Sequence, residues 1–201
     1  MHPLFHPLYI EYCTYFNGNR DYFECHEVLE TYWKEIAPRE RNHPLVGYIQ
    51  VATGMYHWRR GNYSGAERML SKALHIFNSC TSDCPFVEKI DFSDFIAQIS
   101  TAIQRVQKKS AFQPFEIEIT DNALKQLVEK GFEKLPATDH DFIVHKHRLR
   151  DRSEVIAART KSLANRSGEL RFIFYDPIRG PILGSCFGEF RFYVKCWGVL
   201  K

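Results

Sequence analysis

The chain has 201 residues, a length that allows one well-packed core or a core with an appendage. Its content of 44% hydrophobic and 25% charged residues is ordinary for a globular protein. The net charge of +3 is too small to indicate nucleic-acid binding, and no run approaches the roughly 20 apolar residues that a membrane-spanning helix needs. Composition therefore argues against nucleic-acid and membrane proteins.

The cysteines indicate the redox compartment. Only Cys80 and Cys84 lie close together, and a C-x3-C pair without a second pair is not a zinc framework. The sequence also begins with no recognisable signal peptide. We therefore expect a reduced, cytoplasmic protein without a disulfide framework.

Residues 1–110 have the pattern of consecutive amphipathic helices joined by short links, which favours a compact bundle of antiparallel helices and an all-α fold class. Gly18 is expected to take the left-handed position that ends the first helix. Asp21 and Glu24 have the spacing of a capping box, and Pro44 and Gly61 bound the third helix. The expected helices cover residues 7–16, 20–36, 44–59, 63–79 and 92–108.

Two further start signals follow. Ser64, three residues before Glu67, is expected to cap the fourth helix, and Thr120 to cap a helix over residues 121–130. Between them, residues 115–119 alternate in the manner of a short strand or an extended arm.

The C-terminal part differs in composition. The basic run 145–152 is typical of a solvated helix face, with anion or nucleic-acid contact as the alternative. The last segment is rich in Phe, Gly and Cys and could form a β-hairpin from residues 170–175 and 187–194. We divide the chain into a helical bundle (1–110), an extension with short helices (111–160) and a small mixed or poorly ordered tail (161–201).

The most informative residues are His26 and Glu30. Their i, i+4 spacing places them on one helix face with Trp33, on the stripe that is expected to be buried. A buried imidazole beside a buried carboxylate needs a partner, which could be a shared proton, another side chain, a water or a metal ion.

The expected third helix supplies partners. Gly47, Gln50, Gly54 and His57 form one helical stripe, and two glycines on a stripe allow a neighbouring helix to approach closely. If the second and third helices form an antiparallel hairpin, this stripe could bring Gln50 and His57 to His26 and Glu30. His57 also sits near the end of its helix, where a positive charge would complement the helix dipole.

Three interpretations of this cluster stay open. A closed hydrogen-bond network that fixes helix register is favoured. A site for a divalent metal or small ligand is the second, with His26 and Glu30 as metal ligands and Trp33, Gln50 and His57 lining the site. Direct acid–base catalysis is the third, so enzyme activity is left undecided.

Three ordered blocks of sequence resemble the DUF309 family, also called TTHA0068-like proteins. They are residues 22–33, 47–52 and 56–66, and residues 142–156 look like the C-terminal extension of the Bacillus-type members. The resemblance implies an all-α bundle and no established activity. It also implies a candidate metal-binding motif, H-x-x-x-E-x-x-W/Y, at His26, Glu30 and Trp33.

A second resemblance bears on partners. Residues 61–66, followed by Lys72, Ala73 and Leu74, look like the second helix of a tetratricopeptide repeat. Only one copy is visible, whereas a solenoid needs about three repeats. A single helical hairpin of this type could still bind a protein partner or a second copy of the chain. The alternative to metal or ligand binding is therefore a non-enzymatic interaction module in which the His–Glu pair is a structural clamp.

Overall fold

The computed structural model describes residues 2–81, 83–136, 140–149, 175–176 and 180–181. The chain forms two compact units, 1–150 and 151–201, and each is considered by itself. The described part of the first unit consists of helices and their connections, which confirms the all-α prediction. Its boundary after residue 150 differs from the divisions at 110 and 160 that composition suggests.

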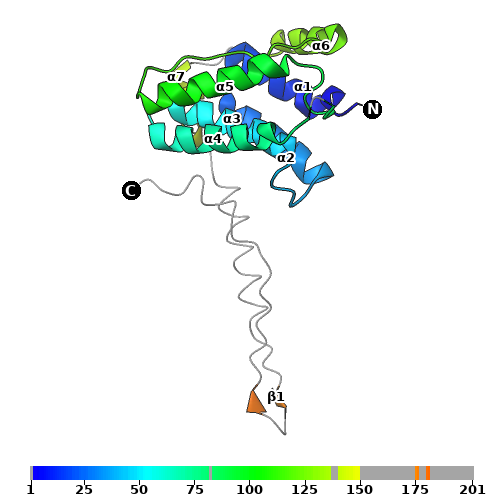
Figure 1. Ribbon diagram of the computed structural model, residues 1–201, viewed down its shortest axis with the longest axis vertical. Helices are drawn as coiled ribbons and strands as arrows, with labels where there is room; N and C mark the ends of the chain where they lie inside the picture. Colours follow the sequence, from blue (N-terminus) through cyan, green and yellow to red (C-terminus); the bar gives the residue numbers. More distant parts are fainter. Residues whose placement is uncertain (1, 82, 137–139, 150–174, 177–179, 182–201) are drawn as a thin grey trace. The chain divides into compact units, whose positions relative to one another are not determined.

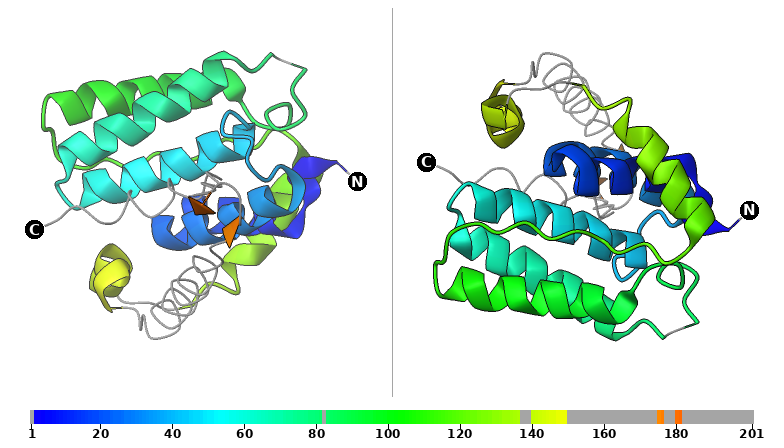
Figure 2. Two further views of the ribbon diagram at one scale, coloured as in Figure 1. Left: turned by 90° about the horizontal axis from the view of Figure 1, so that it is seen from below. Right: turned by 90° about the horizontal axis from the view of Figure 1, so that it is seen from above.

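Five helices form the bundle, and each packs against the next in the chain. Figure 2 shows α3, α4 and α5 side by side, in cyan to green. The expected helices are confirmed to within two residues at all of their ends. The first helix is followed directly by a π-helical turn over Tyr15–Asn19. The helices are α1 (Pro7–Thr14), α2 (Tyr22–Ile36), α3 (Pro44–Arg59), α4 (Tyr63–Asn78) and α5 (Phe92–Gln107).

The helix ends follow local chemistry. Asp21 caps α2 by accepting a hydrogen bond from the backbone N–H of Glu24, as its spacing predicts. Gly61 has the left-handed φ of 72° that follows a helix end. The prediction that Ser64 caps α4 is wrong, because Asn62 accepts the capping hydrogen bond from the backbone N–H of Gly65.

Two other end predictions are wrong. The left-handed residue after the first helix is Arg20, with φ of 58°, and not Gly18. Gly18 instead makes room, because a Cβ there would lie 2.5 Å from Leu135 Cδ1. Asp121, and not Thr120, caps the next helix, α6.

The central helix is α3. Thirteen of its 16 residues are buried, because its sequence is apolar or small on all sides and a helix of that kind must lie inside. Its glycines face α4: a Cβ on Gly47 would lie 2.8 Å from Phe77 Cζ, and one on Gly54 would lie 2.7 Å from Leu70 Cγ. The close helix approach that two glycines predict is therefore present, but with α4.

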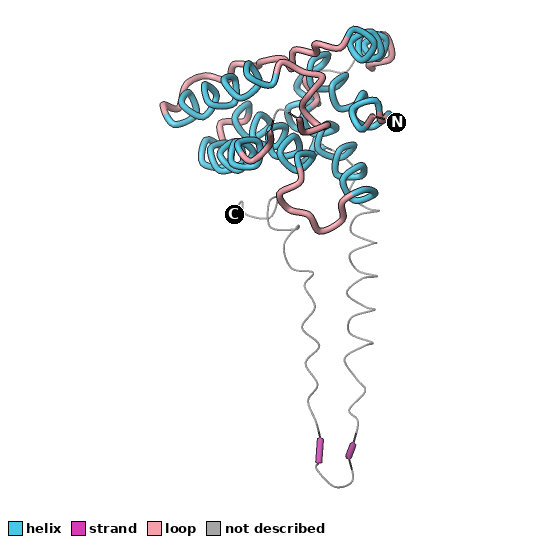
Figure 3. Tube along the Cα trace, turned by 45° about the vertical axis from the view of Figure 1, so that its right-hand side comes forward, coloured by secondary structure: helices cyan, strands magenta, loops and turns pink. Residues whose placement is uncertain are grey.

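Residues 108–121 cross the bundle in extended form and lead into α6 (Asn122–Phe132), which packs on α1. Figure 3 shows this connection as one of the longer loops, in pink. The extended arm predicted at 115–119 is confirmed: Ile119 pairs with Ile90 in an isolated antiparallel bridge, and Ile117 is buried. Both backbone groups of Ile117 bond to the side chain of Asn17.

A further helix and a short hairpin follow α6. Helix α7 (His140–Leu149) contains part of the basic run. In the second unit, β1 (Tyr175–Asp176) pairs antiparallel with β2 (Gly180–Pro181), so a short hairpin forms, but between other residues than expected. The predicted strand at 187–194 lies outside the described residues. Within the described part, no helix is long and apolar enough to cross a bilayer.

Candidate functional site: the α7-binding face of the bundle

His26 and Glu30 lie on α2 as predicted, but each forms an ion pair with another residue of that helix. His26 Nδ1 lies 3.3 Å from Glu27 Oε1, and Glu30 Oε1 lies 3.1 Å from Lys34 Nζ. Their side chains are 15% and 19% exposed, so the two residues are partly exposed and not buried as their stripe predicted. A carboxylate that reaches solvent and pairs with a lysine carries little desolvation cost, so no buried charge compels a metal here.

The residues expected to line the site have separate surroundings. Trp33 is buried, and its Nε1 donates to the carbonyl of Glu40 at 3.0 Å, which fastens the loop after α2. Gln50 is half-buried, and its Oε1 has no hydrogen-bond partner among the described residues. Gly47 and Gly54, which flank Gln50 on its stripe, face α4 and not α2, which corrects the hypothesis that this stripe serves to meet His26 and Glu30.

His57 is a buried, neutral residue. Its Nδ1 lies 3.0 Å from Asn62 Nδ2, the side chain that caps α4. Burial, together with the charges of Arg60 and Arg68, lowers the pKa of His57 to about 4. His57 therefore carries no charge at neutral pH, and the prediction that it complements the helix dipole with positive charge is wrong.

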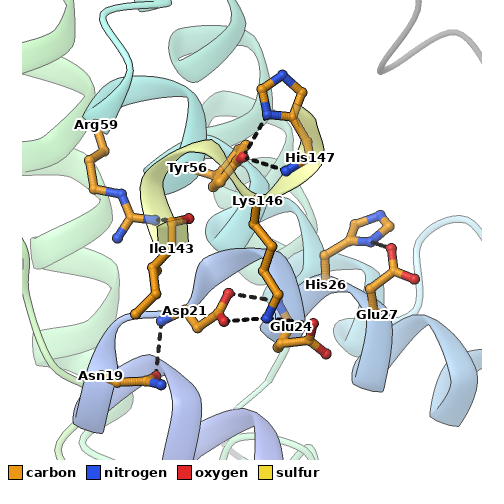
Figure 4. A network of polar contacts seen from close by, with 10 residues as sticks. All are labelled: Asn19, Asp21, Glu24, His26, Glu27, Tyr56, Arg59, Ile143, Lys146 and His147. Atoms are coloured by element: carbon orange, nitrogen blue, oxygen red, sulfur yellow. Dashed lines mark hydrogen bonds and ion pairs between the residues drawn. The ribbon is translucent and has the colours of Figure 1, made fainter. Parts of the chain in front are cut away.

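The structure brings together a different polar cluster, at the beginning of α2 and the end of α3. We call this surface the α7-binding face and define it by Asp21, Glu24, Tyr56 and Arg59. Figure 4 shows α7 lying over it, with Lys146 directed at the two carboxylates. Each of the four residues contacts α7 through a hydrogen bond or an ion pair.

Lys146 makes the charged contacts. Its Nζ donates to Asp21 Oδ2 at 2.6 Å and lies 2.7 Å from Glu24 Oε1, and the lysine side chain is only 16% exposed. Burial lowers the pKa of Lys146, but the hydrogen bonds and charges of the two carboxylates outweigh it, so the pKa is raised above its usual value. Lys146 is therefore a permanent cation that holds α7 in place, and not a base or nucleophile.

The other contacts fix the backbone of α7. Arg59 donates to the carbonyl of Ile143 at 3.2 Å, and the Ile143 side chain is buried. The Tyr56 hydroxyl accepts from the backbone N–H of His147 and lies 2.8 Å from His147 Nδ1. Two of the four contacts thus recognise backbone groups, which any helix lying here can offer.

Sequence reasoning missed this face because the helix that it binds comes much later in the chain. Asp21 and Lys146 are 125 residues apart. Lys146 was expected on a solvated helix face, and the structure contradicts that expectation for this residue. One signal was available: Ile143 and Lys146 are spaced i, i+3, so an apolar and a basic group share one face of a short helix. The side chains of Arg148, Arg150 and Arg152 lie outside the description.

The described residues hold no group of three His, Cys, Asp or Glu side chains that could bind a metal ion. A hollow between α5 and the following connection is lined by Trp58, Arg105, Gln113 and Phe115 among others. It lies apart from His26 and Glu30 in the sequence and contains neither. The chemistry that the α7-binding face supports is recognition of a helix by charge and backbone hydrogen bonds.

Comparison with known proteins identifies the family. The family model described as "Domain of unknown function (DUF309)" matches residues 9–69, which include all four residues of the α7-binding face but end before α7. The chain is 34% identical over 167 residues to a Bacillus subtilis (strain 168) protein described as "Uncharacterized protein YpuF". The match covers 79% of this chain and 94% of that protein. No solved structure matches the chain. By the match to the family model and the extent of this similarity, the chain belongs to the DUF309 family.

Proposed function

We propose that this protein is a non-enzymatic helical interaction module whose α7-binding face receives a basic, amphipathic helix. In the chain alone, its own α7 occupies the face. The observation that carries the proposal is the placement of Lys146, which is largely buried between Asp21 and Glu24 although it belongs to a separate short helix. A cytoplasmic location and a protein partner are part of this proposal.

The composition of the contact supports exchange of one helix for another. Ile143 is buried, whereas the neighbouring Phe142 remains 36% exposed, so α7 leaves part of its apolar surface uncovered. Attachment then rests on ion pairs and hydrogen bonds, whose net contribution is modest because water competes for the same groups. A partner helix with an apolar residue three positions before a lysine would make the same contacts, and could bind more tightly through a larger apolar surface.

A peptide experiment tests the proposal. A fluorescent peptide of residues 140–149 is titrated into the full chain and into its Lys146→Glu variant, and binding is followed by anisotropy. In the variant, the new carboxylate faces Asp21 and Glu24, so α7 should leave and the peptide should bind. Wild-type chain should bind the peptide far more weakly, because its own α7 is present at a high effective concentration.

Two controls make this result decisive. The Lys134→Glu variant changes an exposed lysine outside the face and should behave as wild type. A peptide that itself carries Lys146→Glu should bind neither chain. Circular dichroism checks that each variant is folded. Equal binding of the peptide to wild type and to the Lys146→Glu variant, or equal binding of the reversed-charge peptide, would contradict the proposal.

Metal binding by His26 and Glu30 is a second candidate, and one contact favours it. Glu27 Oε1 lies 3.3 Å from His26 Nδ1, and a carboxylate on one ring nitrogen commonly orients an imidazole whose other nitrogen binds metal. Two donors on α2 fall short of the three or four that a tight zinc site requires, and the described residues offer no third. The site does not fit a firmly held metal.

Elemental analysis tests this candidate. Wild type and Glu30→Ala are purified without chelators and then titrated with zinc, manganese, nickel and iron(II). Near-stoichiometric metal in wild type that is lost in Glu30→Ala would establish the metal site. Metal binding would then replace helix binding as the first candidate function. The matched control is Glu35→Ala, an exposed glutamate on the same helix, which should keep any metal. Metal-free wild type would leave His26 and Glu30 with a structural role.

A further inference from the structure

The loop that follows α4 contains two neighbouring cysteines, Cys80 and Cys84. Cys80 lies just beyond the end of α4, with its Sγ 3.6 Å from the carbonyl of Ile76, and the side chain of Cys84 is a hydrogen-bond partner of the Cys80 thiol. A turn between them, in which the Cys84 N–H donates to the carbonyl of Thr81, brings the chain back. Both cysteines are free and half-buried, so small solutes can reach them.

The surroundings hold this arrangement from both sides. On one side, the backbone N–H of Cys80 donates to the carbonyl of Phe77 in the last turn of α4. On the other side, the hydroxyl of the buried Tyr48 donates to the carbonyl of Phe86 at 2.8 Å, and Val87 is buried. The backbone on both sides of the two cysteines is therefore held by hydrogen bonds and packing, which limits how far the two residues can move apart.

We propose that Cys80 and Cys84 form a reversible intramolecular disulfide when the chain meets a disulfide oxidant such as glutathione disulfide. One cysteine, as its thiolate, attacks a sulfur atom of glutathione disulfide and releases one glutathione thiolate, which leaves a mixed disulfide. The second cysteine attacks that mixed disulfide and releases the second glutathione. The two cysteine protons end on the two released glutathione molecules, so two thiols and one disulfide give one disulfide and two thiols.

The reaction should be slow at neutral pH and faster in alkaline solution. Burial, with the neighbouring Cys84, raises the pKa of Cys80 to about 11, so little of this thiol is ionised near neutrality. Cys13 and Cys25 are fully buried, which protects them from the oxidant while the chain is folded.

Peptide mapping tests the proposal on the full chain. The chain is equilibrated in glutathione buffers of increasing oxidising strength, its remaining thiols are blocked with N-ethylmaleimide, and it is digested with trypsin. Both cysteines fall in the single tryptic peptide 73–89. Oxidised wild type should yield this peptide lighter by two hydrogen atoms and without any N-ethylmaleimide. Because the fold holds the two thiols together, the equilibrium constant should exceed that of the urea-unfolded chain by about tenfold.

Single variants separate the pair from ordinary thiol chemistry. In Cys84→Ser, the mixed disulfide at Cys80 cannot be resolved, so the peptide should carry one glutathionyl group in place of the thiol hydrogen and no internal disulfide. Cys80→Ser should give the same result at Cys84. Wild-type peptide that keeps two N-ethylmaleimide groups in the most oxidising buffer, or that carries two glutathiones, would overturn the proposal. Equal equilibrium constants for the folded and unfolded chains would overturn the claim that the fold positions the two thiols.

Discussion

Asp21 shows how one side chain can serve the helix and the site at once. One of its oxygens accepts the capping hydrogen bond from Glu24, and the other accepts from Lys146. The capping role could be predicted from four residues of sequence, because it depends only on local spacing. The second role could not, because nothing near Asp21 in the chain specifies which cation will reach it. The Asp21 side chain is only 4% exposed, so each of its contacts acts with little screening by water.

His57 gives a prediction about pH. Its folded-state pKa is lowered from 6.5 to about 4, so the unfolded chain binds a proton in a pH range where the folded chain does not. The contribution of His57 to the free energy of unfolding is therefore fully present above the pKa of the unfolded chain. It is lost as the pH falls toward the pKa of the folded chain. We expect the loss to reach about 1–3 kcal/mol between neutral pH and the folded pKa.

Urea unfolding at a series of pH values measures this loss. The His57→Gln variant, which cannot be protonated, should lose less unfolding free energy over the same range than wild type does. Other groups titrate in both proteins and cancel in the comparison. Parallel pH profiles for the two proteins would show that His57 is not the neutral, buried group described above.

At the scale of helices, periodicity and caps predict the elements well. The boundaries of α2 to α5 are set by proline, glycine and capping residues that act within one turn. The bounds that these signals predict agree closely with the observed ones. The identity of the neighbour was harder to predict. Helical spacing shows that Gly47 and Gly54 share a face, but not which helix that face meets, because the interhelix angle depends on all the side chains between the two helices.

Gly54 offers a test of the contact with α4. Replacing a glycine by alanine inside a helix normally raises the free energy of unfolding by about 1 kcal/mol. Here the added Cβ would lie 2.7 Å from Leu70 Cγ and 3.3 Å from the Leu70 backbone nitrogen, so overpacking should dominate. We expect Gly54→Ala to lower the unfolding free energy by about 1–3 kcal/mol.

A double-mutant cycle checks the cause. Leu70→Ala removes the nearest atom and leaves a cavity, so it should be destabilising by itself. The double variant should then cost clearly less than the sum of the two single variants. Simple additivity, or a stabilised Gly54→Ala, would mean that α3 and α4 are further apart than the structure has them.

At the scale of the whole molecule, polar contacts add to the apolar packing that joins the bundle to residues 108–136. Asn17 bonds to both the N–H and the carbonyl of Ile117, each at 2.9 Å. Sequence patterns could predict an extended segment there from its alternation, but not its partner. The same limit applied to α7: local pattern indicated a basic helix, and only the fold places Lys146 beside Asp21.

Asn17→Ala should therefore loosen the extended segment. Loss of both bonds leaves two backbone groups of buried Ile117 unpaired, at a cost of about 1–3 kcal/mol. Hydrogen exchange measured by mass spectrometry should show faster exchange in residues 115–119, with α3 and α4 unaffected. Asn17→Asp keeps an acceptor for the Ile117 N–H and should lie between the two. Unchanged exchange in Asn17→Ala would rule out this anchor.

The position of Gly18 also bears on synthesis of the chain. A Cβ at Gly18 would meet Phe132 and Leu135, and Thr14 bonds to the carbonyl of Val128, so one side of α1 and of the turn after it has neighbours more than a hundred residues later. A ribosome releases the N-terminal end first, at about 5–20 residues per second. During the intervening seconds, the side of α1 that later meets α6 is exposed to the cell, and α1 can be fully enclosed only after residue 135 has emerged.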